Sequence, residues 1–191
     1  GSGSNLLVSD DGINGIVISP AKSLKMLEIE ENSIVAESGV MLGKLVKETM
    51  KRNLTGLESL IGVPGTLGGA LMMNAGSFGG EISNYLISVD VMTSKGKLKT
   101  YKANEIDFSY RFSSFSTDEF ILHARFTLIF EDHNIISERR KVASSGRKTN
   151  QPLRFRSAGS VFKNPKDHAA GYLIDKVGLK GKRIGDAKIT T

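Results

Sequence analysis

The chain has 191 residues, of which 39% are hydrophobic and 24% are charged, and its formal net charge is +6. This composition is typical of a soluble globular protein with one large domain or two small ones, and it excludes an intrinsically disordered chain. Because the sequence contains no cysteine, disulfides, thiolate metal sites and cysteine nucleophiles are excluded as well.

The hydrophobic pattern of the first quarter of the chain predicts short elements. Residues 6–8 and 16–18 read as strands separated by a glycine-containing turn, and residues 23–29 and 33–37 read as a hairpin. Residues 41–52 carry apolar side chains at helical spacing, which predicts an amphipathic helix. A glycine-rich run with room for one short helix follows it.

The second half of the chain predicts two more strands in a hairpin, at residues 86–92 and 97–101, joined by a turn that contains glycine. Residues 120–130 alternate enough to form a long strand, whereas residues 133–148 and 169–177 read as helices. Strands joined mostly by hairpins, with few strand–helix–strand alternations, indicate the α+β class.

The sequence also limits the cellular compartment and the kinds of partner that the protein can be expected to have. No apolar run approaches the ~20 residues of a membrane helix, and no basic flank followed by a hydrophobic core marks a secretory signal. The absence of cysteine agrees with a reducing compartment, so we expect a cytoplasmic protein. The three histidines lie far apart, which argues against a histidine metal cluster. The positive charge hints at an anionic partner, although the densest basic cluster, within residues 139–148, fits a solvated helix face.

Two glycine-rich runs are the most informative features. The first opens the chain as Gly1-Ser-Gly-Ser-Asn-Leu-Leu-Val8, and the second is Gly62-Val-Pro-Gly-Thr-Leu-Gly-Gly-Ala-Leu-Met-Met-Asn-Ala-Gly76. Glycine permits positive φ and lets backbone N–H groups approach a ligand closely. Either run alone is typical of tight turns and close packing. Together they suggest backbone amides that hold a phosphorylated cofactor.

Two common phosphate-binding motifs are absent from the sequence. It has no G-x-x-x-x-G-K-[ST] run, which disfavours a P-loop nucleotidase, and no G-x-G-x-x-G run between a strand and a helix with an acidic residue about 20 positions on. Pro64 stiffens the second run, and Asn74 adds a side-chain amide to it. A rigid loop rich in amides suits a pyrophosphate, because many N–H donors share its charge.

Four sequence blocks carry a family resemblance: GSGSNLLVSD, GVPGTLGGALMMNAGSFGGEI, DFSYRFSSF and SAGSVFKNP. They occur in the order found in bacterial UDP-N-acetylenolpyruvoylglucosamine reductases, which the chain resembles over essentially its whole length. The resemblance implies an α+β protein with an FAD-binding domain of the vanillyl-alcohol-oxidase (PCMH-like) type over residues 1–135. A substrate-binding domain would cover residues 136–191. The short stretch from Arg111 to Gln151 resembles the compact branch that lacks an extra tyrosine-bearing loop.

The resemblance also implies an activity. It is the reduction by NADPH, through FAD, of the enolpyruvyl ether of UDP-N-acetylglucosamine to UDP-N-acetylmuramate, a step of peptidoglycan synthesis. The implied partners are this substrate and NADPH, without nucleic acid, membrane or metal, and we expect a monomer. The implied cofactor-binding residues are Ser2, Gly3, Ser4, Asn5, Leu6, Pro64, Gly65, Thr66, Gly68, Gly69, Asn74, Ala75 and Gly76.

Two residues match catalytic positions of the family. Arg111 matches its active-site arginine, whose planar guanidinium can engage a carboxylate where enolate-like charge develops. Ser160 matches its proton donor. Tyr110, Arg111 and Asn164 are the expected substrate-binding residues. Without the resemblance, Arg111 would read as part of a surface ion pair, Ser160 as a turn residue and Tyr110 as core packing.

Family members continue beyond both ends of this sequence. The resemblance assigns part of the FAD-binding domain to the stretch before Gly1 and a catalytic acidic residue to the stretch after Thr191. We therefore expect a chain truncated at both ends, with weak or absent reductase activity, since a missing general acid costs about 10²–10⁴ in rate.

Two alternatives stay open at this point. Another FAD-dependent oxidoreductase of the same fold would share the glycine runs, although it would not need the blocks around Arg111 and Ser160. A non-enzymatic anion-binding module would explain the net charge of +6 and would be colourless, with salt-dependent binding to DNA or RNA. An oxidised-flavin spectrum separates these classes.

Overall fold

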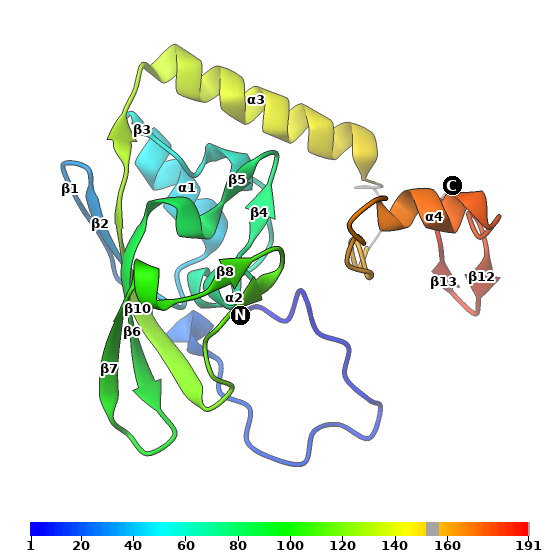
Figure 1. The fold of residues 1–191 in the computed structure, drawn as a ribbon, viewed down its shortest axis with the longest axis horizontal. Coiled ribbons are helices and arrows are strands. Elements are labelled where there is room, and N and C mark those ends of the chain that lie inside the picture. Colours follow the sequence, from blue (N-terminus) through cyan, green and yellow to red (C-terminus); the bar gives the residue numbers. More distant parts are fainter. Residues whose placement is uncertain (152–156, 191) are drawn as a thin grey trace. The chain divides into compact units, whose positions relative to one another are not determined.

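The computed structural model describes residues 1–151 and 157–190, and the chain divides into two compact units, residues 1–146 and 147–191. Figure 1 shows the elements, and each unit is described by itself. The helices of the first unit are α1 (Leu42–Met50), α2 (Leu67–Met72) and most of α3 (His133–Asn150), with 3-10 turns η1 (Pro20–Lys22), η2 (Glu58–Leu60), η3 (Ile82–Tyr85) and η4 (Ala103–Glu105).

The strands of the first unit are β1 (Leu27–Glu30), β2 (Ser33–Glu37), β3 (Leu54–Thr55), β4 (Gly76–Ser77), β5 (Gly80–Glu81), β6 (Leu86–Thr93), β7 (Leu98–Lys102), β8 (Phe108–Ser109), β9 (Phe112–Ser113), β10 (Glu119–Thr127) and β11 (Ile129–Phe130). The second unit contains α4 (Ala170–Lys176), β12 (Arg183–Ile184) and β13 (Ala187–Lys188). The mixed helices and sheets confirm the predicted α+β class.

A five-stranded antiparallel sheet, in the order β1-β2-β10-β6-β7, forms the centre of the first unit. Successive side chains of a strand point to opposite faces, so alternate residues share one face. On β2 and β10 the buried cross-strand pairs are Ala36 with Ala124 and Ile34 with Phe126. These pairs belong to the hydrophobic core.

Local patterns predicted several elements correctly. The β1–β2 hairpin turns at Glu31, whose φ is 50°, and the β6–β7 hairpin turns at Gly96, whose φ is 74°. Helix α1 buries Leu42, Leu45, Val46, Thr49 and Met50, the stripe that its spacing predicted. The short helix expected inside the second glycine run is α2, and the two later helices are α3 and α4.

The long strand predicted at residues 120–130 is broken at Leu128. The backbone N–H of Leu128 donates to the Asn32 carbonyl at 2.9 Å, and the Asn32 side chain donates back to the Leu128 carbonyl at 3.0 Å. After this break β11 leaves the central sheet and pairs with β3. The alternation of the sequence continues across the break, because both sides of it are strands.

The strands predicted at residues 6–8 and 16–18 are wrong, since both segments are irregular. Leu7 is 100% exposed and Ile16 is 92% exposed. A strand needs a neighbour for its backbone hydrogen bonds, and no described strand pairs with either segment. The strand predicted from residue 23 starts only at Leu27, because the backbone N–H groups of Ser23 and Leu24 donate to the Pro20 carbonyl of the preceding turn η1, both at 3.0 Å.

Helix α3 packs into the first unit along most of its length. Ile136 is fully buried and Ala143 is 2% exposed, and the first unit includes the helix as far as Gly146. The predicted division between residues 135 and 136 stays a prediction. Among the helices that the structure describes, none has the length and apolar character needed to cross a bilayer.

Candidate cofactor and active site

The two glycine runs lie against each other in the first unit. The Ser4 hydroxyl donates a hydrogen bond to the Pro64 carbonyl at 3.3 Å. A Cβ added to Gly65 would lie 3.5 Å from the Ser4 Oγ, and one added to Gly69 would lie 3.4 Å from the Gly1 Cα. Segments about sixty residues apart in sequence therefore form one surface built largely of backbone and hydroxyl groups.

The first run is open to solvent on its other side. Ser2, Gly3, Asn5 and Leu6 are exposed, and Gly3 has a φ of 74° with no atom within 4 Å of where its Cβ would be. A left-handed conformation with free space above it is one in which a side chain would be disfavoured and a ligand can approach the backbone.

The second run is fixed to the end of β2 through α2. The backbone N–H of Gly68 donates to the Ser38 carbonyl at 2.9 Å, and that of Leu67 donates to the Val40 carbonyl at 2.9 Å. A Cβ on Gly68 would lie 2.9 Å from the Ser38 Cβ, so only glycine fits there. These two amides are engaged within the protein. Donors to a cofactor must therefore come from elsewhere in the loop.

Buried polar atoms without partners gather around this loop. They include the hydroxyl oxygens of Ser38 and Thr66 and the side-chain oxygen of Asn74. Buried polar atoms in proteins nearly always have a hydrogen-bond partner. The two unpaired hydroxyls can donate to a phosphate-bearing group such as the FAD that the resemblance implied, whereas the Asn74 oxygen can only accept a hydrogen bond.

The end of the second run is joined to the hairpin that carries Arg111. Asn74 is fully buried with a φ of 39°, and its Nδ2 donates to the Glu81 Oε2 at 2.7 Å and to the Ser109 carbonyl at 3.1 Å. The Arg111 Nη2 donates to the Gly76 carbonyl at 2.8 Å. Ala75 lies between these two anchored residues. The structure thus brings Arg111, Asn74 and Gly76 together.

Arg111 is held in an uncommon conformation. Its φ of 56° lies in the left-handed region, which few residues other than glycine adopt. Its guanidinium carbon lies 5.1 Å from the centre of the Tyr110 ring. A guanidinium carries five N–H donors, and among the described residues its hydrogen bond goes to Gly76. The remaining donors are available for a carboxylate.

Ser160 and Asn164 lie in the second unit. Ser160 is exposed and follows Gly159, which has a φ of 71° and whose N–H donates to the Ser157 hydroxyl at 3.0 Å. The Asn164 side-chain oxygen accepts a hydrogen bond from the Ala170 N–H at 2.9 Å, at the start of α4. Because each unit is described by itself, the approach of Ser160 and Asn164 to Arg111 stays a prediction.

Residue-by-residue matching to the family missed several contacts of the site. Glu81 and Ser109 hold Asn74, and the Ser113 hydroxyl donates to the Met72 carbonyl at 2.8 Å. All three residues lie within or beside the matched sequence blocks. A glutamate or serine in a polar stretch normally reads as a solvated residue, so its contact with a loop 7 to 41 positions away leaves no local signal.

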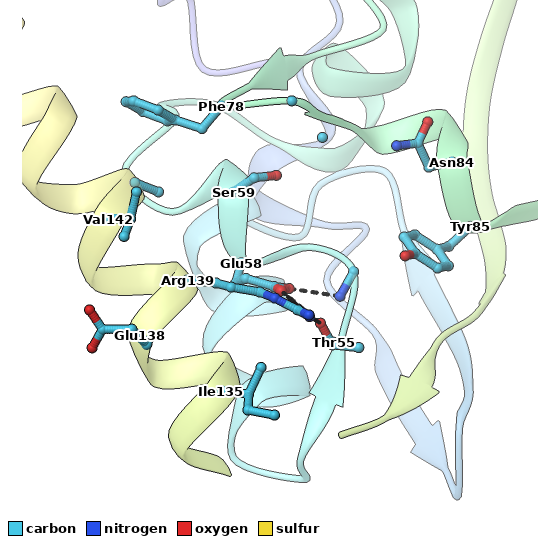
Figure 2. A pocket seen from close by; sticks show the side chains of 14 residues that line it. Thr55, Glu58, Ser59, Phe78, Asn84, Tyr85, Ile135, Glu138, Arg139 and Val142 are labelled. Atoms are coloured by element: carbon cyan, nitrogen blue, oxygen red, sulfur yellow. Dashed lines mark hydrogen bonds and ion pairs between the residues drawn. The ribbon is translucent and has the colours of Figure 1, made fainter. Parts of the chain in front are cut away.

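A separate cavity of about 600 Å³ lies between α3 and the β3–η2 and β4–β5 segments (Figure 2). At its floor Glu58, which is 6% exposed, accepts hydrogen bonds from the Thr55 hydroxyl and the Gly56 N–H, both at 2.7 Å. Arg139 of α3 donates to Thr55 at 2.9 Å and lies 3.6 Å from the Glu58 carboxylate. This network fastens α3 to the rest of the first unit.

Replacing Glu58 with alanine should lower the free energy of unfolding by about 1–3 kcal/mol, because the buried N–H and hydroxyl groups lose their acceptor. The urea midpoint of the variant, followed by circular dichroism, measures this loss. Glu138→Ala is the matched control, since that exposed glutamate pairs with Lys141 on the surface of α3 and should change stability by at most about 0.5 kcal/mol. Equal midpoints for both variants would contradict the role given to Glu58.

The histidines of the first unit make polar contacts. His123 lies 2.7 Å from the Asp90 carboxylate, which also contacts Arg125 at 3.2 Å and Thr100 at 2.6 Å. Burial opposes ionisation of Asp90, but the hydrogen bonds and neighbouring positive charges outweigh it and lower the pKa of Asp90. No group of three or more potential metal ligands occurs among the described residues.

Comparisons with known proteins agree with the geometry. The family model of the FAD binding domain matches residues 1–102, and that of the UDP-N-acetylenolpyruvoylglucosamine reductase C-terminal domain matches residues 151–191. The UDP-N-acetylenolpyruvoylglucosamine reductases of Clostridium tetani and Listeria welshimeri are 44% and 42% identical to the whole chain. The chain covers 62% and 64% of these relatives, so it spans less than two thirds of their length.

A solved structure is similar over nearly the whole chain. The crystal structure of UDP-N-acetylenolpyruvylglucosamine reductase from Thermus caldophilus matches with a TM-score of 0.85 and 34% sequence identity. The match covers 98% of this chain and 68% of that protein. Both compact units therefore have counterparts in one solved relative.

Proposed function

Because this chain belongs to the UDP-N-acetylenolpyruvoylglucosamine reductase family, we propose that its two glycine runs bind FAD and that the protein carrying it reduces UDP-N-acetylglucosamine enolpyruvate to UDP-N-acetylmuramate, with NADPH as reductant. The first run and residues 64–76 form the cofactor site in this proposal. The division near residue 135 separates the FAD-binding domain from a substrate-binding domain.

One observation carries the proposal. The glycine runs adjoin through Ser4 and Pro64, and the end of the second run holds Arg111 through the Gly76 carbonyl. The loop proposed to bind phosphate and the cation proposed to bind a carboxylate are therefore neighbours in one unit. An anion-binding module would need the first feature only. A reductase acting on an enolpyruvyl carboxylate needs both.

The chemistry divides between the cofactor and the chain. When bound, FAD carries hydride from NADPH to the substrate. Arg111 would donate hydrogen bonds to the enolpyruvyl carboxylate, where enolate-like negative charge grows as hydride adds to the terminal carbon of the enolpyruvyl group. Ser160 would deliver a proton to the carbon beside that carboxylate. Tyr110 and Asn164 would hold the substrate in this orientation.

The remaining parts of the proposal concern partners and compartment. We propose a monomeric protein of the cytoplasm without nucleic-acid or membrane partners. The net charge of +6 then serves the anionic cofactor and the UDP group of the substrate.

The absorption spectrum tests the cofactor assignment. The protein that carries this sequence, mixed with FAD and then desalted, should retain an oxidised-flavin spectrum. NADPH should bleach that spectrum without oxygen, and UDP-N-acetylglucosamine enolpyruvate should restore it. Retained flavin that the enolpyruvyl substrate fails to reoxidise would favour another oxidoreductase of the same fold. A colourless protein that binds DNA in a salt-dependent manner would overturn the proposal.

A further inference from the structure

The hairpin that carries Arg111 depends on outside contacts for its position. Strands β8 and β9 contain two residues each, and so short a hairpin is not stable alone in water. Three hydrogen bonds tie it to the α2–β4 segment: Ser113 to the Met72 carbonyl at 2.8 Å, Arg111 to the Gly76 carbonyl at 2.8 Å, and Asn74 to the Ser109 carbonyl at 3.1 Å.

Asn74 is the one of these anchors whose side chain is fixed by a charged partner. Its Nδ2 serves two acceptors, the Ser109 carbonyl and the Glu81 carboxylate at 2.7 Å. Only the NH₂ end of an amide can donate twice, so these acceptors determine which way the amide faces. The bond to a carboxylate is charge-assisted and stronger than a neutral one.

Glu81 is built into the turn beside the second glycine run. It lies on β5 and pairs with Gly76 of β4. A Cβ on Gly76 would lie 2.9 Å from the Glu81 Cγ, so the glycine leaves the space that the glutamate side chain crosses. The same Gly76 supplies the carbonyl that receives Arg111.

From these contacts we infer that Glu81 is a positioning residue for the reductase reaction: its carboxylate fixes the Asn74 amide, which fixes the Ser109–Arg111 turn and so the Arg111 guanidinium. The inference rests on the proposed function for its catalytic consequence only. Loss of the carboxylate lets the Asn74 amide rotate, which removes the bond to Ser109 and leaves Arg111 in a left-handed turn with one support fewer. Arg111 then spends less time where the substrate carboxylate binds.

Hydrogen exchange tests the positioning directly, without cofactor or substrate. In Glu81→Ala, amides of residues 107–114 should exchange at least about 10-fold faster than in the unaltered protein, because local opening becomes easier. Glu81→Gln should stay within about 3-fold, since its carbonyl oxygen can still accept from Asn74. Glu48→Ala is the matched control, because that carboxylate of α1 pairs with Lys51 and Arg52, which directly follow the helix.

Flavin kinetics test the catalytic consequence. With saturating FAD, Glu81→Ala should slow reoxidation of the reduced flavin by the enolpyruvyl substrate about 10-fold, while reduction of the flavin by NADPH stays within about 2-fold. Glu81→Gln should recover most of the reoxidation rate.

Unchanged exchange at residues 107–114 in Glu81→Ala would overturn the inference, as would a glutamine variant as impaired as the alanine variant. The proposed function fails separately, if the unaltered protein retains no FAD or is not reoxidised by the substrate. In that event the exchange measurement still decides whether Glu81 positions the hairpin.

Discussion

The Ser160→Ala variant is expected to reduce its flavin with NADPH at the normal rate and to reoxidise it with UDP-N-acetylglucosamine enolpyruvate about 10²–10⁴-fold more slowly. That range is the usual contribution of a positioned proton donor. Measuring the two half-reactions separately isolates the effect of the serine. A proton on the substrate carbon is needed only when the substrate reoxidises the flavin, and not when NADPH reduces it. Stopped-flow absorbance at the flavin band measures both rates in one protein.

Ser157→Ala provides the control for this variant. Ser157 stands in the same sequence block, and its hydroxyl accepts the Gly159 N–H at 3.0 Å, so its loss should affect the loop without removing the proton donor. Its reoxidation rate should stay within about 10-fold of normal, since a local hydrogen bond contributes about 1 kcal/mol. Equal rates for both variants would remove Ser160 from the proton-transfer step.

The Arg111→Ala variant is expected to lose about 10²–10³-fold in the same reoxidation step, which is the usual cost of removing one group that stabilises charge developing in the transition state. Arg111→Lys should recover only part of the rate, because an ammonium cannot hold a carboxylate with two parallel N–H groups. Flavin reduction by NADPH again serves as the internal reference. Arg52→Ala, an exposed arginine paired with Glu48 on α1, should react normally.

A result in which Arg111→Lys matches the unaltered protein would assign Arg111 a merely electrostatic contribution. A result in which Arg111→Ala reoxidises normally would exclude it from the site. The stability of the alanine variant should fall by only about 0.5–1.5 kcal/mol, the usual contribution of one hydrogen bond, here the bond from Arg111 to the Gly76 carbonyl. The backbone adds little to this loss, because the left-handed φ of 56° is unfavourable for arginine and for alanine alike.

Elements with a local cause were predictable from the sequence. The spacing of Leu42, Leu45 and Val46 predicted the buried face of α1, because a helix is held by bonds between near neighbours. The turn at Gly96 was predictable as well, because a tight turn also depends on residues that are near neighbours in the sequence. Residues 6–8 have an apolar pattern just as clear, but strand formation depends on a partner elsewhere in the chain, and no described strand supplies one.

The candidate site likewise has parts that the sequence could predict and parts that it could not. The glycine runs predicted a phosphate-binding loop from composition alone, while Arg111 and Ser160 emerged only through resemblance to a family. The contact between Asn74 and Glu81 joins an amide to a carboxylate seven positions away. No periodicity marks it, because the chain reverses direction between β4 and β5.

Gly146, near the end of α3, lies against Phe78, whose ring lines the cavity between α3 and the β4–β5 segment. A Cβ at this position would lie 2.5 Å from an edge carbon of the Phe78 ring, closer than any real contact. Helix and ring are thus matched in size as a pair. A larger residue in place of Gly146 should therefore displace the Phe78 ring, which is 49% exposed and free to turn, before it displaces the helix backbone.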